Sequence, residues 1–539
     1  MDDRLLTLPP IWLLVLDLFG TQHLIASEEV TITDSRGFVR VFRAGLTEAS
    51  ITEAIGTLGE SPTGEPTATL TELYIPGALQ WISQGAETIV GRGELSVFPR
   101  GEGWERRSVL VSGRVRDSRV RRGDFVDVVI GDQLGDDRGT LLPPSAVVNS
   151  DTWPSHADNA ADVGYPIVFG EPGVYTLATG ASANTTGSPA PMVDATVGAE
   201  VLLVCMGRVQ AQNVTIRNED DGSEDSFAIT EVEDDLGQLV SVVSLATPGA
   251  LTVDADTAYH ARWDGGGGIY SDLGELLDGA GSVLIWALRR SSVRVDLAAL
   301  EAVRQELDQF TLGGYVNDAS FSPMDWVADN LLPILPISLV FGADGLAPIV
   351  HRYDYALTDI ELTLNEDEPG ARITDDGVTS SGEPIGGFRL VYAWSVLLER
   401  GRRKRTITGD PEQTALNAAN IKPDSLCARA FELLAQVDGE ATPPTIEEIE
   451  TRVVYDEATA RRILSSTAGL RAIPPKEVQI DVTWPIGARL RLGQIVQVRS
   501  RDFYIDRPGR VAELTYSIEG VRVRVLLDAH HERDRYNRV

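Results

Sequence analysis

One stretch of the sequence, residues 283–352, decides the fold; it reads VLIWALRRSSVRVDLAALEAVRQELDQFTLGGYVNDASFSPMDWVADNLLPILPISLVFGADGLAPIVHR. Apolar residues recur at helical spacing after Asp296, whose carboxylate can cap the first turn. A second helix is predicted to begin at Ser322 and to end before Pro333, because proline cannot continue a helix. Two apolar runs then flank residues 342–345, Gly-Ala-Asp-Gly, which suit the turn of a β-hairpin. The stretch therefore predicts two amphipathic helices that pack on a small sheet.

The sequence on both sides of this stretch is mostly of β type. Short runs of branched and apolar residues alternate with Gly, Pro and Thr in the first third, which predicts a barrel or sandwich. A second group of short strands, separated by acidic loops, is predicted up to a flexible glycine run at 265–268. The β pattern returns over 478–527, with Glu519-Gly520 as a hairpin turn, and residues 365–385 read as a polar excursion. Helices are also predicted at residues 76–82, 415–419, 423–435 and 457–466.

Composition sets the outer limits for partners and compartment. The chain has 539 residues, 43% of them hydrophobic, so it can bury more than one core. Its formal charge of -33 disfavours non-specific binding to DNA or to anionic lipid. Cys205 and Cys427 support neither a disulfide framework nor a metal site, which favours a reduced compartment. Residues 5–18 are apolar enough to suggest a signal peptide, but the acidic residues before them and Pro9-Pro10 favour a buried strand at residues 11–18. No segment is long and apolar enough to span a membrane.

The familiar catalytic motifs are missing from the sequence. It contains no phosphate-binding Gly-rich loop ending in Lys-Ser or Lys-Thr, no Gly-x-Ser-x-Gly elbow and no His-Glu-x-x-His pattern. The six histidines are scattered, so none is assigned as a general base. We therefore expect a protein that is not an enzyme, with no catalytic, cofactor-binding or metal residues and no cofactor.

An acidic segment at residues 219–225, followed by Glu231, Glu233, Asp234 and Asp235, is the best candidate for a cation site. The segment does not fit the calcium-loop pattern of the EF-hand. If Gly222 or Gly237 is the glycine of that pattern, the first ligand position is Arg217 or Val232, and neither can bind calcium there. A solvated loop is the simpler interpretation. Clustered carboxylates without that spacing can still bind a cation, and two of them can also be proposed as a glycosidase pair.

A basic cluster at residues 399–405, Glu-Arg-Gly-Arg-Arg-Lys-Arg, is the sharpest concentration of positive charge. It can contact DNA or an acidic neighbour. A hairpin tip in solvent, or a contact with protein, is favoured because no aromatic residues are interleaved to stack on bases. The nine tryptophans are spread evenly, which indicates core or interface positions rather than a carbohydrate platform.

The order of these pieces resembles the tail hub proteins of long-tailed phages and phage-like gene transfer agents, relatives of the contractile-tail baseplate hub and of the type VI secretion spike base. Four parts carry the resemblance: residues 93–96 leading into 112–115; 165–170; 313–317 through 332–336; and the closing run from 490 to 527. The resemblance implies two tube-like β-barrels per subunit and assembly as a trimer, so that six barrels match a hexameric tail tube. Exposed sheet edges need partners, and ring closure supplies them.

The resemblance implies a mainly β fold with an α+β insertion and several domains. The expected division is an N-terminal hub β-barrel domain at 1–142, an inserted β domain at 143–268, an α/β insert at 269–352, a mixed α/β part of the second hub region at 353–473, and a β segment completing the second barrel at 474–539.

The function implied by the resemblance is that of a structural virion protein. A trimeric hub would close the distal end of the tail tube, link it to the tip and fibres, and open for DNA ejection. Expected partners are the homotrimer, the distal tail protein ring, the tape measure protein, tail tip or fibre proteins and DNA in transit, with no stable membrane association. The protein would be assembled in the host bacterial cytoplasm and located at the virion tail tip. The alternatives are a tail-borne or secreted polysaccharide or peptidoglycan hydrolase with β accessory domains, and a glycan-binding adhesin.

Overall fold

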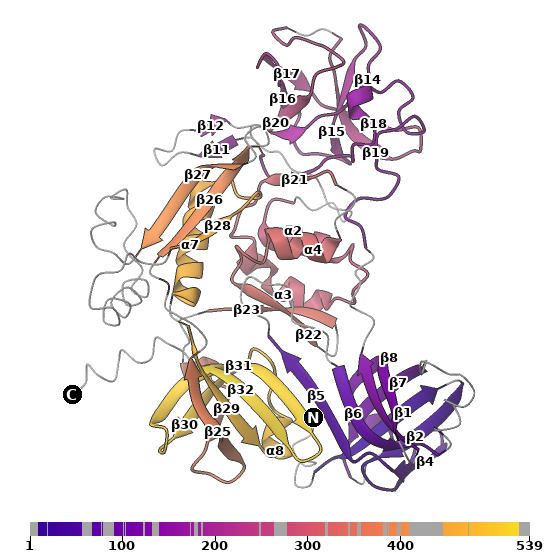
Figure 1. The fold of residues 1–539 in the computed structure, drawn as a ribbon. Coiled ribbons are helices and arrows are strands. Elements are labelled where there is room, and N and C mark those ends of the chain that lie inside the picture. Colours follow the sequence, from indigo (N-terminus) through magenta and orange to yellow (C-terminus); the bar gives the residue numbers. More distant parts are fainter. Residues whose placement is uncertain are drawn as a thin grey trace, which may run out of the picture.

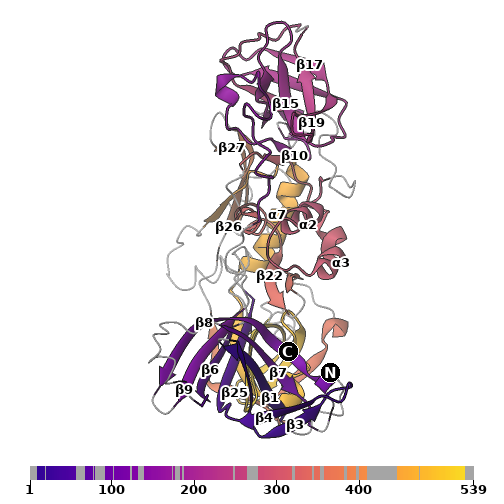
Figure 2. The same ribbon diagram turned by 90° about the vertical axis from the view of Figure 1, so that its right-hand side faces the viewer.

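The protein is elongated, with a small β domain at one end, a large sheet at the other and a helical body between them (Figures 1 and 2). It is mainly β with a few helices, as predicted. The computed structural model describes residues 9–18, 20–55, 67–76, 78, 91–100, 102, 104–121, 124–131, 139–172, 174–176, 182–184, 187–246, 249–263, 277–318, 322–342, 345–352, 357–380, 385, 387–395, 400–408, 446–472 and 474–527. The helices predicted at 415–419 and 423–435, and nearly all of the one at 76–82, lie outside these residues.

The large sheet contains 15 strands and draws on both ends of the sequence. Its N-terminal half is made of β1 (Ile11–Leu18), β2 (Thr21–Ala26), β3 (Val30–Thr33), β4 (Val39–Ala44), β5 (Glu48–Ala54), β6 (Thr67–Tyr74), β7 (Gly91–Phe98), β8 (Ser108–Arg121) and β9 (Phe125–Gly131). Its C-terminal half is made of β24 (Leu362–Asn365), β25 (Ala371–Ser380), β29 (Lys476–Val482), β30 (Ile495–Ser500), β31 (Ile505–Ser517) and β32 (Val521–Leu527).

The two halves are joined in one continuous sheet. The strand order is β25-β29-β32-β31-β5-β6-β9-β8-β7-β1-β2-β4-β3, with β30 on the free part of β31 and β24 beside β30. Two separate barrels were expected; in the described strands neither half closes on itself, and β31 pairs directly with β5. The division of the chain at residues 142, 268, 352 and 473 stays a prediction.

The sequence of strand β1 is almost continuously apolar because both of its faces are buried. Alternate residues of a strand face opposite sides, and both sides of β1 are covered. Trp12 and Leu14 face the large core shared by both halves of the sheet. Ile11 and Leu13 face a smaller core under β3 and β4. The predicted buried strand near the start of the chain is therefore confirmed.

The small β domain is built from two four-stranded sheets. One contains β13 (Ser188–Pro189), β20 (Tyr259–Arg262), β16 (Asn213–Asn218) and β17 (Glu224–Ala228) in that order. The other contains β14 (Met192–Asp194), β15 (Val201–Met206), β19 (Leu239–Ser244) and β18 (Thr230–Glu233). A separate ribbon pairs β11 (Val174–Thr176) with β12 (Ser182–Asn184).

The body between the two β parts contains the stretch 283–352. Its elements are α2 (Ala280–Leu288), α3 (Leu297–Leu307), α4 (Pro323–Asn330), the hairpin of β22 (Ile337–Gly342) and β23 (Gly345–Val350), and β21 (Gly314–Val316), which pairs with β10 (Ile167–Phe169). Beside them lie α7 (Glu457–Arg471) and a sheet of β27 (Arg400–Thr408), β26 (Gly387–Ser395) and β28 (Ile446–Glu450). A short helix, α8 (Trp484–Gly487), packs on β32.

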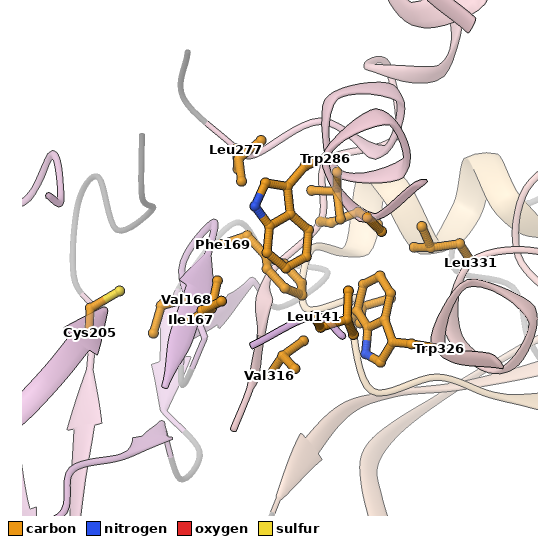
Figure 3. Close-up of a cluster of buried hydrophobic side chains, with 14 of the residues drawn as sticks. Leu141, Ile167, Val168, Phe169, Cys205, Leu277, Trp286, Val316, Trp326 and Leu331 are labelled. Atoms are coloured by element: carbon orange, nitrogen blue, oxygen red, sulfur yellow. The ribbon is translucent and has the colours of Figure 1, made fainter. Parts of the chain in front are cut away.

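One core runs from the body into the small β domain. Trp326 meets Phe169 and Trp286 edge-on, at centroid distances of 5.7 Å and 6.5 Å (Figure 3). Cys205 lies at the β-domain end of the same cluster, where Val168 also packs. The strand β10 thus ties the small domain to the helices.

Both predicted helix starts and the hairpin are confirmed. Asp296 accepts a hydrogen bond from the Ala299 amide at 3.0 Å, and Ser322 accepts one from Asp325 at 3.1 Å. The hairpin pairs Gly342 with Gly345, as the turn composition indicated. The sequence analysis did not predict α2, and the predicted excursion at 365–385 contains strand β25.

We expect the substitution Ser322→Ala to lower the free energy of unfolding by about 1 kcal/mol, because it removes the side-chain acceptor of the α4 N-terminus. Denaturant unfolding measures this change. The control is Ser226→Ala, at an exposed position of β17, where a much smaller loss is expected. Equal losses in the two variants would contradict a capping role for Ser322.

Candidate assembly surface

The acidic segment lies at the turn between β16 and β17. Asp225 accepts hydrogen bonds from the amides of Gly249 and Ala250 at 2.7 Å and 3.0 Å. Asp221 accepts one from Ser223 at 2.8 Å. Backbone donors hold the pKa of Asp225 below its usual range, because they stabilise the charged form. These carboxylates therefore hold the loops of the small domain together.

Glu224 is engaged in the same way. Its two oxygens contact Arg217 at 2.8 Å and Arg262 at 3.0 Å, across neighbouring strands of one sheet. These contacts use both oxygens of the carboxylate. In the described part of the chain, no group of three or more His, Cys, Asp or Glu side chains could hold a metal ion.

Asp234 lies apart from the first acidic group and anchors the small domain to the body. The Tyr165 hydroxyl donates to it at 2.8 Å, and the Trp153 indole donates to the Tyr165 oxygen at 2.9 Å. Burial raises the pKa of Tyr165 to about 12, and the nearby Asp234 carboxylate also raises it. The phenol therefore stays a neutral donor at physiological pH.

We expect millimolar calcium to leave the unfolding temperature of the protein unchanged, because the carboxylates of Asp221, Glu224 and Asp225 already accept protein donors. A thermal scan with calcium and with a chelator checks this expectation. A binding-linked rise in the unfolding temperature with calcium concentration would contradict it.

Residues 400–405 of the basic cluster lie in strand β27, at the end of its hairpin with β26 where Arg400 pairs with Ser395, and Glu399 lies outside the described residues. Residues 400–408 pair along their length with β26. Lys404 is exposed and lies 3.7 Å from Glu448 of β28, which also contacts Arg389 at 3.2 Å. Of the cluster, Lys404 therefore contacts an acidic residue of its own sheet.

Most tryptophans whose side chains are described lie inside the protein. Those less than 6% exposed are Trp12, Trp263, Trp286, Trp326 and Trp484. Trp104 is stacked on Phe42 at 5.9 Å and lies between the guanidinium groups of Arg40 and Arg107. This distribution agrees with the core and interface positions that the sequence predicted.

The strongest candidate surface is the β-ribbon formed by β3, β4 and their connecting turn, residues 30–44. Phe38 is 65% exposed, Val39 is 61% and Val41 is 52%. Opposite Val41 and Val39 on the same face lie Thr31 and Thr33. This outward face is therefore β-branched and uncharged over Thr31, Thr33, Val39 and Val41, and the exposed Arg43 lies at the end of β4 on the same face. Its uncharged part favours packing against another sheet.

The inward face of the ribbon fixes its position. Ile32 and Phe42 are buried against β1, and Trp104 covers Phe42. In the turn, the Asp34 carboxylate accepts from the amides of Arg36 and Phe38, both at 2.9 Å. The exposed side chains are thus presented by an ordered ribbon.

The ribbon lies at one open end of the large sheet. Strand β3 pairs with β4 on one side only, and β25 pairs with β29 on one side only at the other end. Unpaired strand edges invite another chain to add its own strand. Strands at residues 30–33 and 39–44 were predicted within the β pattern of the first third, whereas the exposed surface that they form was not; its signal is the run Phe38-Val39-Arg40-Val41-Phe42, in which only Arg40 is polar.

Comparison with known proteins gives a likeness in three dimensions only. No protein-family model and no curated protein matches the sequence. The chain is similar to the 43 kDa tail protein of prophage MuSo2 from Shewanella oneidensis, with 11% identity and a TM-score of 0.34 over 96% of this chain and 98% of that one. It is similar to the tail protein from Neisseria meningitidis MC58, with 9% identity and a TM-score of 0.35 over 96% and 97%.

A third similar chain belongs to the virion of a native gene transfer agent particle, with 12% identity and a TM-score of 0.35 over 62% of this chain and 78% of that one. Among the described residues, no helix is long and apolar enough to cross a membrane.

Proposed function

We propose that the protein is a structural component of a phage-type tail, and specifically the hub that closes the distal end of the tail tube. One observation carries the proposal. The two ends of the sequence come together as two halves of one sheet, which remains open at β3 and at β25. A subunit with two open sheet edges is suited to ring closure, because a ring leaves no edge unpaired.

The proposed ring contains three copies. Each copy contributes an N-terminal and a C-terminal half-sheet, so three copies match the six-fold symmetry of a tube. The ribbon at residues 30–44 would supply apolar contact area between copies, with Phe38, Val39 and Val41 buried in the assembly. The small β domain and the body, which extend away from the sheet, would face the neighbouring tail components (Figure 1).

The other proposed partners follow from the same position in the particle. They are the distal tail protein ring, the tape measure protein and the tip or fibre proteins, with DNA passing through the lumen during ejection. The formal charge of -33 supports passage without adhesion, because like charges repel. In this proposal the protein is not an enzyme, works at the virion tail tip and is assembled in the host bacterial cytoplasm.

Mass in solution tests the proposal. Light scattering on the purified full chain should give a species of three copies that persists on dilution, and the same sample should not cleave peptidoglycan. A stable monomer that cleaves peptidoglycan would remove the hub and support the hydrolase. Saturable binding of a monomer to host glycans would instead support the adhesin.

A further inference from the structure

The two halves of the large sheet meet along one ladder, which we call the seam. It joins β5 to the last part of β31 in antiparallel register, from Glu513 opposite Ala54 to Ser517 opposite Ser50. Before the bulge that follows Val511, β31 instead pairs with β30. Among the described strands, no other pairing links the two halves.

Glu53 of β5 is an acidic residue in a row of apolar side chains on the inner face of the seam. Side chains on one face of a strand recur with period two, so Glu53 shares its face with Ile51 and Ile55, which are 0% and 7% exposed. Its partner across the seam, Leu514, is also fully buried. Glu53 itself is half-buried, so its carboxyl group stands at the margin of a core-facing row in which apolar residues are the rule.

The described side chains near Glu53 are aliphatic, apart from one tyrosine. In the same row of side chains the neighbours are Ile51 and Ile55, and Ala68 of β6 lies opposite Ile51. On β31, besides Leu514, the facing titratable group is the phenol of Tyr516, which feels the charge of Glu53. Burial, then this charge, raises the pKa of Tyr516, so the phenol stays neutral.

Tyr516 in turn belongs to an aromatic row that crosses between the halves. It stacks on Trp484 at 6.0 Å, and Trp484 meets Trp12 of β1 edge-on at 5.8 Å. The Trp484 indole also donates to the Ser517 carbonyl at 3.0 Å. Ionisation of Glu53 would therefore place a charge next to Tyr516, which belongs to the aromatic row that packs β1, α8 and β31 together.

The outer face of the seam has a different chemistry. Thr52 and Thr515 lie opposite each other with their hydroxyl oxygens 3.2 Å apart, exposed to solvent. Glu513, on the same face, is paired with Arg524 at 3.1 Å. The carboxylate of the outer face thus has an arginine, whereas Glu53 faces the core.

We propose that the seam is a joint controlled by protonation: neutral Glu53 holds β5 against β31, and loss of its proton to solvent loosens this ladder so that the two halves can move apart. The proposal goes beyond the hub function and does not depend on it.

Burial raises the pKa of Glu53 from 4.5 to about 7. The folded state therefore holds the proton more tightly than the unfolded chain does. The stabilisation by neutral Glu53 is complete below pH 4.5 and is lost as the pH rises through about 7. The joint is then closed in mildly acidic solution and loosened above neutral pH.

Amide hydrogen exchange tests the joint in the full chain. After correction for intrinsic rates, peptides covering β5 and the end of β31 should exchange on the order of 10- to 100-fold faster at about pH 8.5 than at about pH 5. Glu53→Gln should exchange slowly at both pH values. The matched control is Glu48→Gln on the same strand, where the carboxylate is exposed and accepts from Thr71; it should behave as the wild type does.

A second variant keeps the proposal testable if Glu53→Gln fails to fold. The pair Thr52→Cys and Thr515→Cys, oxidised to a disulfide across the outer face, should remove the pH dependence, and reduction should restore it. Wild-type pH dependence in Glu53→Gln or in the oxidised pair would overturn the proposal. So would seam exchange in the wild type that does not change with pH.

Discussion

Replacing Gly170 by alanine is expected to lower the free energy of unfolding by about 3 kcal/mol or more. Gly170 follows β10 with φ +57°, a left-handed conformation that costs an alanine about 1–2 kcal/mol. An added Cβ would lie 1.9 Å from the Leu312 carbonyl oxygen and 2.9 Å from the Gly313 Cα, so the backbone must shift. Overpacking of this kind adds about 1–3 kcal/mol.

The matched control is Gly198→Ala. Gly198 also has a left-handed backbone, with φ +83°, but no atom lies within 4 Å of an added Cβ. We expect this variant to lose only the conformational term, about 1 kcal/mol. Denaturant unfolding of both variants separates strain from crowding. Equal losses of unfolding free energy in the two variants would contradict the close approach of the loop before β21 to β10. They would also contradict the packing of the small domain on the body at this point.

The second large effect is expected from the ribbon. Replacing Val41 by aspartate places a charge in the middle of its apolar outward face, at a position 52% exposed in the single chain. A charge buried without a partner in an assembly costs about 2 kcal/mol or more, so each contact should weaken on the order of 30-fold. Light scattering over a dilution series should then show single chains where the wild type forms rings.

Val197→Asp is the control for this substitution. Val197 is 93% exposed at a turn of the small β domain, far along the chain from the ribbon. Its replacement should leave assembly unchanged. Neither variant should alter the unfolding of the isolated chain, since both positions face solvent there. Assembly that survives Val41→Asp would remove the ribbon from the interface.

Local features of the fold were predictable from the sequence, and long-range ones were not. The caps at Asp296 and Ser322 depend on residues within one turn, so the sequence alone identifies them. Helix α2 was missed because all of its side chains are buried, which leaves no polar face to give a periodic signal. Strand β25 was missed because the strand that pairs with it, β29, comes about a hundred residues later.

In the candidate surfaces, too, local features were predictable from the sequence and long-range contacts were not. Residues 219–223 of the acidic segment form the predicted loop between strands, whereas Glu224 and Asp225 lie in β17 and Glu231 and Glu233 in β18. Its donors, such as Gly249 for Asp225, come from another loop and cannot be inferred from spacing. The seam and the place of Glu53 within it depend on the pairing of β5 with β31, which lie at opposite ends of the sequence. The strands of the ribbon were predictable, but their exposed face was not, because exposure is a property of the assembled sheet.

The central claim is that the protein forms a ring at the distal end of a tail tube. Imaging of intact particles that carry a specific label on this chain tests it most directly. We expect three copies around the tail axis, at the end of the tube, with the large sheets of neighbouring copies side by side. Copies elsewhere on the particle, or single copies without three-fold symmetry, would contradict it.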